Sequence, residues 1–219
     1  MSPKTLMCFG DSLTWGWTPT EQTAPTERFP QDLRWTGILA DRLGTGHRVI
    51  EEGLSGRTTT ADDPLDGRLN GSAYLPAALA SHFPLDLVLI MLGTNDTKAY
   101  FGRAPFDIGT GMAALVNQVL TSAGGVGTTY PAPKVLVIAP PPLAPIPNPW
   151  FAQVFAGGSE KSSQLAEVYS AMARFFGVDF FDAGSVITTD GVDGIHFTAQ
   201  NNRDLGEALA PVVLDLLAG

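Results

Sequence analysis

The sequence has little cysteine and few basic residues, and each shortage excludes a class of protein. Cys8 is the single cysteine among 219 residues, so no disulfide can form within the chain. Lysine and arginine number 13 against 22 acidic residues, and the formal net charge is −9. Because nucleic-acid affinity rests largely on basic side chains that neutralise phosphates, we expect no nucleic-acid partner.

Long apolar runs and clustered metal ligands are also missing. The apolar run before Gly10 is too short for a signal sequence or a membrane span, so the expected location is the cytoplasm, without a membrane partner. The three histidines form no His-x-His pair and no cluster with cysteine, so neither a metal nor another cofactor is expected. The glycine-rich nucleotide-binding fingerprints are absent as well, which disfavours a nucleotide-binding protein.

Short apolar runs alternate with helical patterns along the whole chain. This alternation predicts an α/β fold with a parallel, doubly wound sheet, in one domain spanning residues 1–219. Segments 124–133 and 140–149 contain too many glycines and prolines for a helix or strand. We interpret the second as an ordered loop near the active site or at a subunit contact. The expected strands are 5–9, 48–51, 85–92, 135–139 and 178–181, and the expected helices are 32–43, 75–82, 106–123, 160–176 and 199–217.

Polar clusters follow the predicted strands at the points where ligands bind in such sheets. They are residues 10–12, 53–55, 93–96 and, after the last strand, 193–196. Ligands of a doubly wound sheet sit at the carboxyl ends of its strands, so these clusters predict one shared site.

A serine hydroxyl becomes a good nucleophile when a histidine removes its proton and a carboxylate orients that histidine. Asp193 lies three residues before His196, so one loop can bring the two side chains together. His47 and His82 have no such carboxylate in a loop after a strand, which favours His196 as the base. Asp190 is a rival for the orienting carboxylate.

The nucleophile has three candidates on spacing alone. Ser12 and Ser55 both follow predicted strands in tight, glycine-containing turns, and spacing does not separate them. Cys8 lies inside a predicted strand and is interpreted as a small core residue. The chain has no Gly-x-Ser-x-Gly, so the nucleophile elbow of ordinary α/β-hydrolases is absent. Backbone N–H groups of Ser12 and Gly53, with the side-chain amide of Asn95, could serve as oxyanion donors.

Together these clusters resemble the sequence blocks of the SGNH (GDSL) hydrolase family. Residues 9–13 are similar to block I, Gly53 to block II, residues 93–96 to block III and residues 193–196 to block V. The resemblance implies a three-layer, flavodoxin-like sandwich with a five-stranded parallel sheet. It also implies a triad of Ser12, Asp193 and His196, with oxyanion donors at Ser12, Gly53 and Asn95, and it selects Ser12 over Ser55.

A closer resemblance covers the chain almost from end to end. Segments 8–17, 34–37, 95–101 and 124–131, with the proline-rich loop through residue 151, are similar to a mycobacterial branch of the family. Its members are aryl esterases that also act as acyltransferases and perhydrolases. The resemblance implies small aryl or alkyl esters as acyl donors, with water, alcohols, amines or hydrogen peroxide as acceptors. It also implies a homo-oligomer, an octamer in that branch.

A predicted substrate pocket surrounds the triad. Several of its aromatic residues could equally be ordinary core residues, and Lys98 could be a solvated lysine. Two other functions stay open: a carbohydrate acetylesterase, and a non-catalytic ligand-binding module on the same fold. The predicted pocket residues are Leu13, Trp17, Ser55, Thr94, Lys98, Trp150, Phe151, Phe155 and Ile195.

Overall fold

The computed structural model describes residues 3–189 and 191–218 and is built on one five-stranded parallel sheet. The strand order β2-β1-β3-β4-β5 is that of the flavodoxin-like fold, which confirms the predicted fold class. This order reverses direction between β1 and β3, so the crevice outside their carboxyl ends is the expected ligand site. The strands are β1 (Lys4–Gly10), β2 (His47–Gly53), β3 (Leu87–Met91), β4 (Lys134–Ala139) and β5 (Asp179–Asp182).

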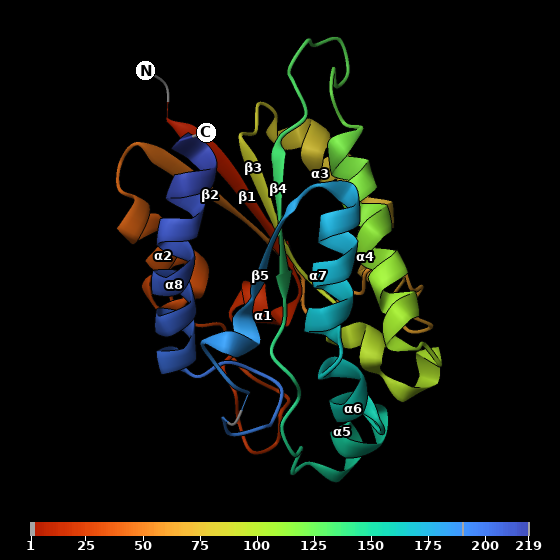
Figure 1. Ribbon diagram of the computed structural model, residues 1–219. Helices are drawn as coiled ribbons and strands as arrows, with labels where there is room; N and C mark the ends of the chain where they lie inside the picture. Colours follow the sequence, from red (N-terminus) through yellow and green to blue (C-terminus); the bar gives the residue numbers. More distant parts are fainter. Residues whose placement is uncertain (1–2, 190, 219) are drawn as a thin grey trace.

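Helices cover both faces of the sheet, giving three layers (Figure 1). One face packs against α2 (Trp35–Leu43) and α8 (Ala199–Ala218), and the other against α3 (Gly71–His82), α4 (Pro105–Leu120) and α7 (Leu165–Phe176). Strand β1 shows why both layers are needed: Met7 and Phe9 join one buried cluster, while Leu6 and Cys8 join the other. Successive side chains of a strand point to opposite faces, so a strand apolar throughout must be covered twice.

Three short helices gather at the carboxyl end of the sheet: α1 (Ser12–Trp15), α5 (Pro149–Val154) and α6 (Gly158–Ser162) (Figure 1). Helix α1 starts where the Asp11 carboxylate accepts the Leu13 N–H at 2.9 Å, and α5 starts where Asn148 accepts the N–H groups of its first turn. Short 3₁₀ turns complete the chain: Gln31–Leu33, Gly67–Leu69, Asn95–Thr97, Ala99–Phe101 and Ala183–Ser185.

The predicted helix over residues 160–176 is wrong in its first turn, because α6 ends at Ser162 and α7 begins at Leu165. The predicted helix at 75–82 begins earlier than expected. The side chain of Asn70 caps α3 by accepting the N–H groups of Ser72 and Ala73, so the helix starts at Gly71.

Helices α2 and α8 approach closely at Gly206. A Cβ atom placed there would lie 2.7 Å from the Trp35 carbonyl oxygen, nearer than real contacts allow. Gly206→Val should therefore lower the free energy of unfolding by roughly 1–3 kcal/mol, the usual effect of overpacking. Urea unfolding measures this, with Gly46→Ala as control, since a Cβ at Gly46 meets open space. Equal stability of the two variants would contradict the proposed close approach.

Candidate active site

The site centres on a hydrogen bond between two loops at opposite ends of the chain. His196 Nε2 lies 3.0 Å from Ser12 Oγ, although 184 positions separate the two residues. Ser12 begins α1 directly after β1, and His196 lies in the loop that precedes α8. Both side chains are 6% exposed, so the hydroxyl and imidazole meet in a nearly dry environment at the predicted edge of the sheet.

Asp193 holds the other side of the imidazole ring. Its Oδ2 lies 2.8 Å from His196 Nδ1, while its Oδ1 accepts the backbone N–H groups of Ile195 and His196 at 3.0 and 2.9 Å. Burial alone would raise the pKa of Asp193, but these hydrogen bonds and the nearby imidazole outweigh it and lower the pKa. The carboxylate therefore stays ionised and fixes which ring nitrogen of His196 faces Ser12.

Two contacts fix the loop that carries Asp193 and His196. Gly194 has φ +74°, and a Cβ there would lie 2.4 Å from the Pro145 carbonyl oxygen of the proline-rich loop. The Ala144 N–H donates to the Gly194 carbonyl oxygen at 3.0 Å, so the proline-rich loop packs on the site as expected. On the other side, the Trp17 ring stacks on the imidazole with centroids 4.9 Å apart and planes 16° apart.

Asn95 reaches the same edge from the turn after β3. Its Nδ2 group donates to Asp11 Oδ2 at 3.1 Å and to the Arg57 carbonyl oxygen at 3.2 Å. Both amide hydrogens therefore have protein acceptors in the substrate-free chain. An oxyanion that binds the Asn95 amide therefore has to share one of these two hydrogens with the Asp11 carboxyl group or the Arg57 carbonyl oxygen.

Asp11 is an unusual carboxyl group, although its place in the sequence gives it no predicted chemical role. It is fully buried, and burial together with the charge of Asp96 raises its pKa to about 7. Hydrogen bonds from Leu13 and Asn95 and the charge of Arg57 oppose this rise. Asp11 therefore gains or loses its proton near neutral pH while it holds the Asn95 amide.

The position of Gly53 does not support its predicted role as an oxyanion donor. The Glu52 carbonyl oxygen and the Gly10 carbonyl oxygen both accept from Arg57 Nη1, so the Glu52 carbonyl points toward β1. In a trans peptide the following N–H points the opposite way, which turns the Gly53 N–H away from Ser12. Gly56 is the better candidate in this loop: it has φ +89° in the turn closed by the Arg57 N–H, and its own N–H has no acceptor among the described residues.

The other candidate nucleophiles and bases lack the hydrogen bonds that join Ser12, His196 and Asp193. No described residue accepts from or donates to the Ser55 hydroxyl, and burial raises the pKa of the Cys8 thiol, with Glu51 adding to the rise. His82 does pair with a carboxylate, Glu52 at 2.7 Å, but no hydrogen bond joins its imidazole to a serine hydroxyl among the described residues. Asp190 lies outside the described residues.

Leu13, Thr94 and Lys98 are three of the predicted pocket residues. Leu13 is buried in the core between the sheet and helices α2 and α8, directly after Ser12. Thr94 is buried beside Asn95, and its Oγ1 has no partner among the described residues. Lys98 is largely buried, with Nζ 3.9 Å from Asp63; burial lowers its pKa, and Asp63 opposes this.

Some of the predicted apolar pocket residues form a buried cluster, and one is exposed. Phe155 and Ile195 are buried in one small cluster with Leu143, and Phe151 packs against it. Trp150, in the first turn of α5, is 72% exposed and lies outside this cluster, so its place in the pocket stays a prediction.

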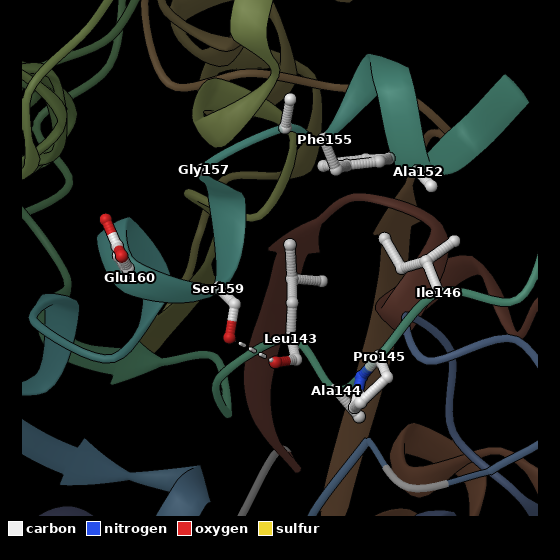
Figure 2. A pocket seen from close by; sticks show the side chains of 10 residues that line it. Leu143, Ala144, Pro145, Ile146, Ala152, Phe155, Gly157, Ser159 and Glu160 are labelled. Carbon is white, nitrogen blue, oxygen red and sulfur yellow. Dashed lines mark hydrogen bonds between the residues drawn. The ribbon is translucent and has the colours of Figure 1, made fainter. Parts of the chain in front are cut away.

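A cavity of about 410 Å³ lies beside this cluster, between the proline-rich loop and helices α5 and α6. The side chains of Leu143, Ile146 and Phe155 point into it, and the Ser159 hydroxyl donates to the Leu143 carbonyl oxygen at 3.0 Å (Figure 2). Of the predicted pocket residues only Phe155 lines this cavity, so it is not the space directly above Ser12.

Within residues 3–189 and 191–218, no three histidine, cysteine or acidic side chains are grouped closely enough to hold a metal ion. None of the helices in this part of the chain combines the length and apolar character needed to cross a membrane.

Comparisons with known proteins identify the family. Residues 8–203 match the model of the GDSL-like lipase/acylhydrolase family, so the chain belongs to that family. It is a carboxylic ester hydrolase of the serine type, built on the SGNH hydrolase fold. A search of curated proteins gave no match.

Several solved structures are similar to this chain in sequence and in fold. The aryl esterase of M. smegmatis is 70% identical over 97% of this chain and 99% of its own, with a TM-score of 0.96. Est24, a carbohydrate acetylesterase from Sinorhizobium meliloti, is 63% identical with the same coverage and TM-score. A second carbohydrate acetylesterase family member from that organism is 40% identical, covering 99% of this chain and all of its own, with a TM-score of 0.89.

The raised pKa of Asp11 predicts a pH-dependent contribution to stability. Between about pH 4 and pH 7 the folded chain keeps a proton on Asp11 that the unfolded chain has released. Stability from this group is therefore present at low pH and is lost as pH rises toward 7, by at most about 1.4 kcal/mol per pH unit. We expect the free energy of unfolding, measured with urea from pH 4.5 to 8, to change less with pH in Asp11→Asn than in wild type. The exposed control Asp32→Asn should follow wild type, and parallel curves for all three proteins would contradict the prediction.

Proposed function

We propose that Ser12, His196 and Asp193 form the catalytic triad of an esterase that acts on small aryl or alkyl esters through an acyl-enzyme. One observation carries this: the hydrogen-bonded series from Asp193 through His196 to the Ser12 hydroxyl, with distances of 2.8 and 3.0 Å. These groups lie in the order and at the separations that nucleophilic acyl transfer requires.

The reaction follows from the placement of the protons. His196 Nε2 takes the proton from Ser12 as Oγ attacks the ester carbonyl carbon, and the carbonyl oxygen becomes negative. The resulting imidazolium returns this proton to the departing alcohol as the carbon–oxygen bond breaks, which leaves the acyl group on Ser12. An acceptor then gives its proton to His196 and attacks the acyl carbon. The bond from that carbon to Ser12 Oγ breaks as the imidazolium returns the proton to Oγ, which releases the product and restores the hydroxyl. Asp193, held ionised by its hydrogen bonds, stabilises the imidazolium in both steps.

The negative oxygen needs donors placed in advance. We assign this role to the Ser12 N–H at the start of α1, the Asn95 amide and a backbone N–H from the loop after β2, for which Gly56 fits better than Gly53. The first N–H groups of a helix have no partner within it, so that of Ser12 is available to a ligand.

Acyl transfer to acceptors other than water belongs to the same proposal. Phe155 and Ile195 next to the triad, with Trp17 against His196, provide apolar surroundings that favour an alcohol or hydrogen peroxide over water. The 70% identity to an aryl esterase supports the choice of ester, because nearly the whole of both chains aligns.

Ser12→Ala tests the nucleophile and the acyl-enzyme together. With p-nitrophenyl acetate we expect wild type to release p-nitrophenol and, with added alcohol, to form the new ester in water, whereas Ser12→Ala should lose both activities. Ser55→Ala is the matched control and should retain turnover. Activity that persists in Ser12→Ala and disappears in Ser55→Ala would overturn the assignment.

Asn95→Ala tests the oxyanion donor. Turnover should fall about 10²- to 10³-fold, the effect of removing one such donor, while KM changes little because the donor acts mainly in the transition state. The steady-state kinetics of p-nitrophenyl acetate hydrolysis measures both constants. An unchanged turnover would remove Asn95 from the mechanism.

A second candidate function is deacetylation of carbohydrates, favoured by the 63% identity to Est24. The same triad would catalyse both reactions, and the shape of the pocket would decide between an aryl or alkyl ester and an acetylated sugar. Release of acetate from acetylated sugars, compared with p-nitrophenyl acetate at equal concentration, separates the two: a higher kcat/KM on the sugar ester would favour the carbohydrate acetylesterase.

We further propose that the protein works in the cytoplasm as a homo-oligomer, an octamer by its resemblance to the aryl esterase branch. Exposed aromatic side chains support self-association. Phe106 and Phe175 are 76% and 84% exposed beside an apolar groove between α4 and α7. Light scattering of the purified protein gives the mass, and a monomer at micromolar concentration would overturn the oligomer.

A further inference from the structure

Arg57 lies directly behind the proposed catalytic edge, and the mechanism above gives it no role. Its side chain is 2% exposed. The guanidinium carbon lies 4.2 Å from the ring centre of Phe9 and 5.3 Å from that of Tyr74. Among the described residues Arg57 forms no ion pair with a carboxylate, and its Nε has no hydrogen-bond partner. The guanidinium is thus buried against aromatic rings and carbonyl groups, and the carboxyl groups of Glu52 and Asp11 are near enough to favour its charge without forming an ion pair.

The hydrogen bonds of Arg57 join three loops that meet at the site. Nη1 donates to the Gly10 carbonyl oxygen at 2.9 Å and also to that of Glu52. These carbonyl groups are at the ends of β1 and β2, and Gly10 stands two residues before Ser12. The main-chain carbonyl of Arg57 accepts from the Asn95 amide at 3.2 Å. One residue therefore contacts the supports of the Ser12 loop, the loop after β2 and Asn95.

The burial of this charge costs stability that an apolar side chain would not. A cation taken out of water loses its hydration, and carbonyl groups and aromatic faces return only part of it. The positive charge of Arg57 can assist catalysis, however, if the negative charge of the oxyanion develops near it. In a site of low effective dielectric, a fixed cation close to a forming oxyanion lowers the barrier without any rearrangement.

We propose that Arg57 is a positioning residue of the oxyanion hole: it aligns the Ser12 loop and Asn95, and its charge favours the tetrahedral intermediate. This rests on the proposed function, because it presumes that Ser12 attacks an ester. The alternative is that Arg57 only joins the ends of β1 and β2 and contributes to stability alone.

Arg57→Lys and Arg57→Met separate these two roles. Lysine keeps the charge but cannot bridge two carbonyl groups with a planar fork, and methionine keeps the bulk without the charge. We expect kcat for p-nitrophenyl acetate to fall about 10- to 100-fold in Arg57→Lys and about 10²- to 10³-fold in Arg57→Met, with KM within about twofold. Arg34→Lys is the matched control, because Arg34 is also largely buried and hydrogen-bonded but contacts Phe29 and Glu51 instead.

A transition-state analogue provides a readout that a purely structural role would not change. A trifluoromethyl ketone bearing a short acyl-like chain adds to the serine and carries an oxyanion, whereas the substrate in its ground state carries none. Across wild type and the variants, the loss of affinity for this ketone should equal the loss in kcat/KM. Proteins that lose thermal stability but keep both kcat and ketone affinity would overturn the proposal.

Tyr74→Leu covers the case in which the Arg57 variants do not fold. It removes one of the two rings that hold the guanidinium, and Tyr74 is 40% exposed, so the core is little disturbed. We expect a two- to fivefold loss of kcat with a matching loss of ketone affinity, the effect of one cation–π contact. Unchanged kcat and ketone affinity would count against the role of Arg57.

The same experiment includes Ser12→Ala, which separates the two levels of failure. If Ser12→Ala keeps wild-type turnover, the proposed function itself is wrong. If Ser12→Ala is inactive and the Arg57 variants turn over normally, only the role of Arg57 is refuted.

Discussion

The 3.0 Å contact between His196 Nε2 and Ser12 Oγ depends on nearly every other feature of this molecule. It joins two loops that lie 184 positions apart, so it forms only if the sheet brings the end of β1 and the loop before α8 to one edge. Sheets with the order 2-1-3-4-5 place loops from both sides of the switch point at that edge. Fold and chemistry are therefore coupled through the strand order rather than through any single motif.

The support of the site is polar and buried, which carries a cost in stability. Asp11, Arg57 and Asn95 are all at most 6% exposed, and they hold one another through hydrogen bonds and charge. Deeper still, Asp96 is fully buried between Thr59 and Arg103, with Oδ1 2.5 Å from Arg103 Nη1. The hydrogen bonds of such a network fix its side chains closely, and this is the property that preorganised donors require.

Much of the fold could be predicted because its signals are local. Continuous apolar runs identify the buried strands, and glycine and proline mark the irregular loops. Helix α5 was missed because proline-rich context suggested a loop, although Asn148 followed by Pro149 is a helix-start signal. For the site, residue type and order predicted Asp193 and His196, whereas Ser12 was separated from Ser55 only by the family resemblance. The orientation of a single peptide group cannot be read from the sequence, which is why Gly53 was predicted as a donor and Gly56 was not. Arg57 and Asp11 gave no signal because burial, which makes them unusual, depends on tertiary packing.

The stacking of Trp17 on His196 has an optical consequence. The indole is fixed by its N–H bond to the Thr23 carbonyl oxygen at 3.1 Å and lies 4.9 Å from the imidazole centre. An excited indole gives up an electron more readily to a charged imidazolium than to a neutral ring, so its emission dims when His196 is protonated. The residue proposed to move the proton thus has a fluorophore stacked on its ring, which makes the emission of Trp17 a reporter of the charge on His196 in the resting protein, without any substrate.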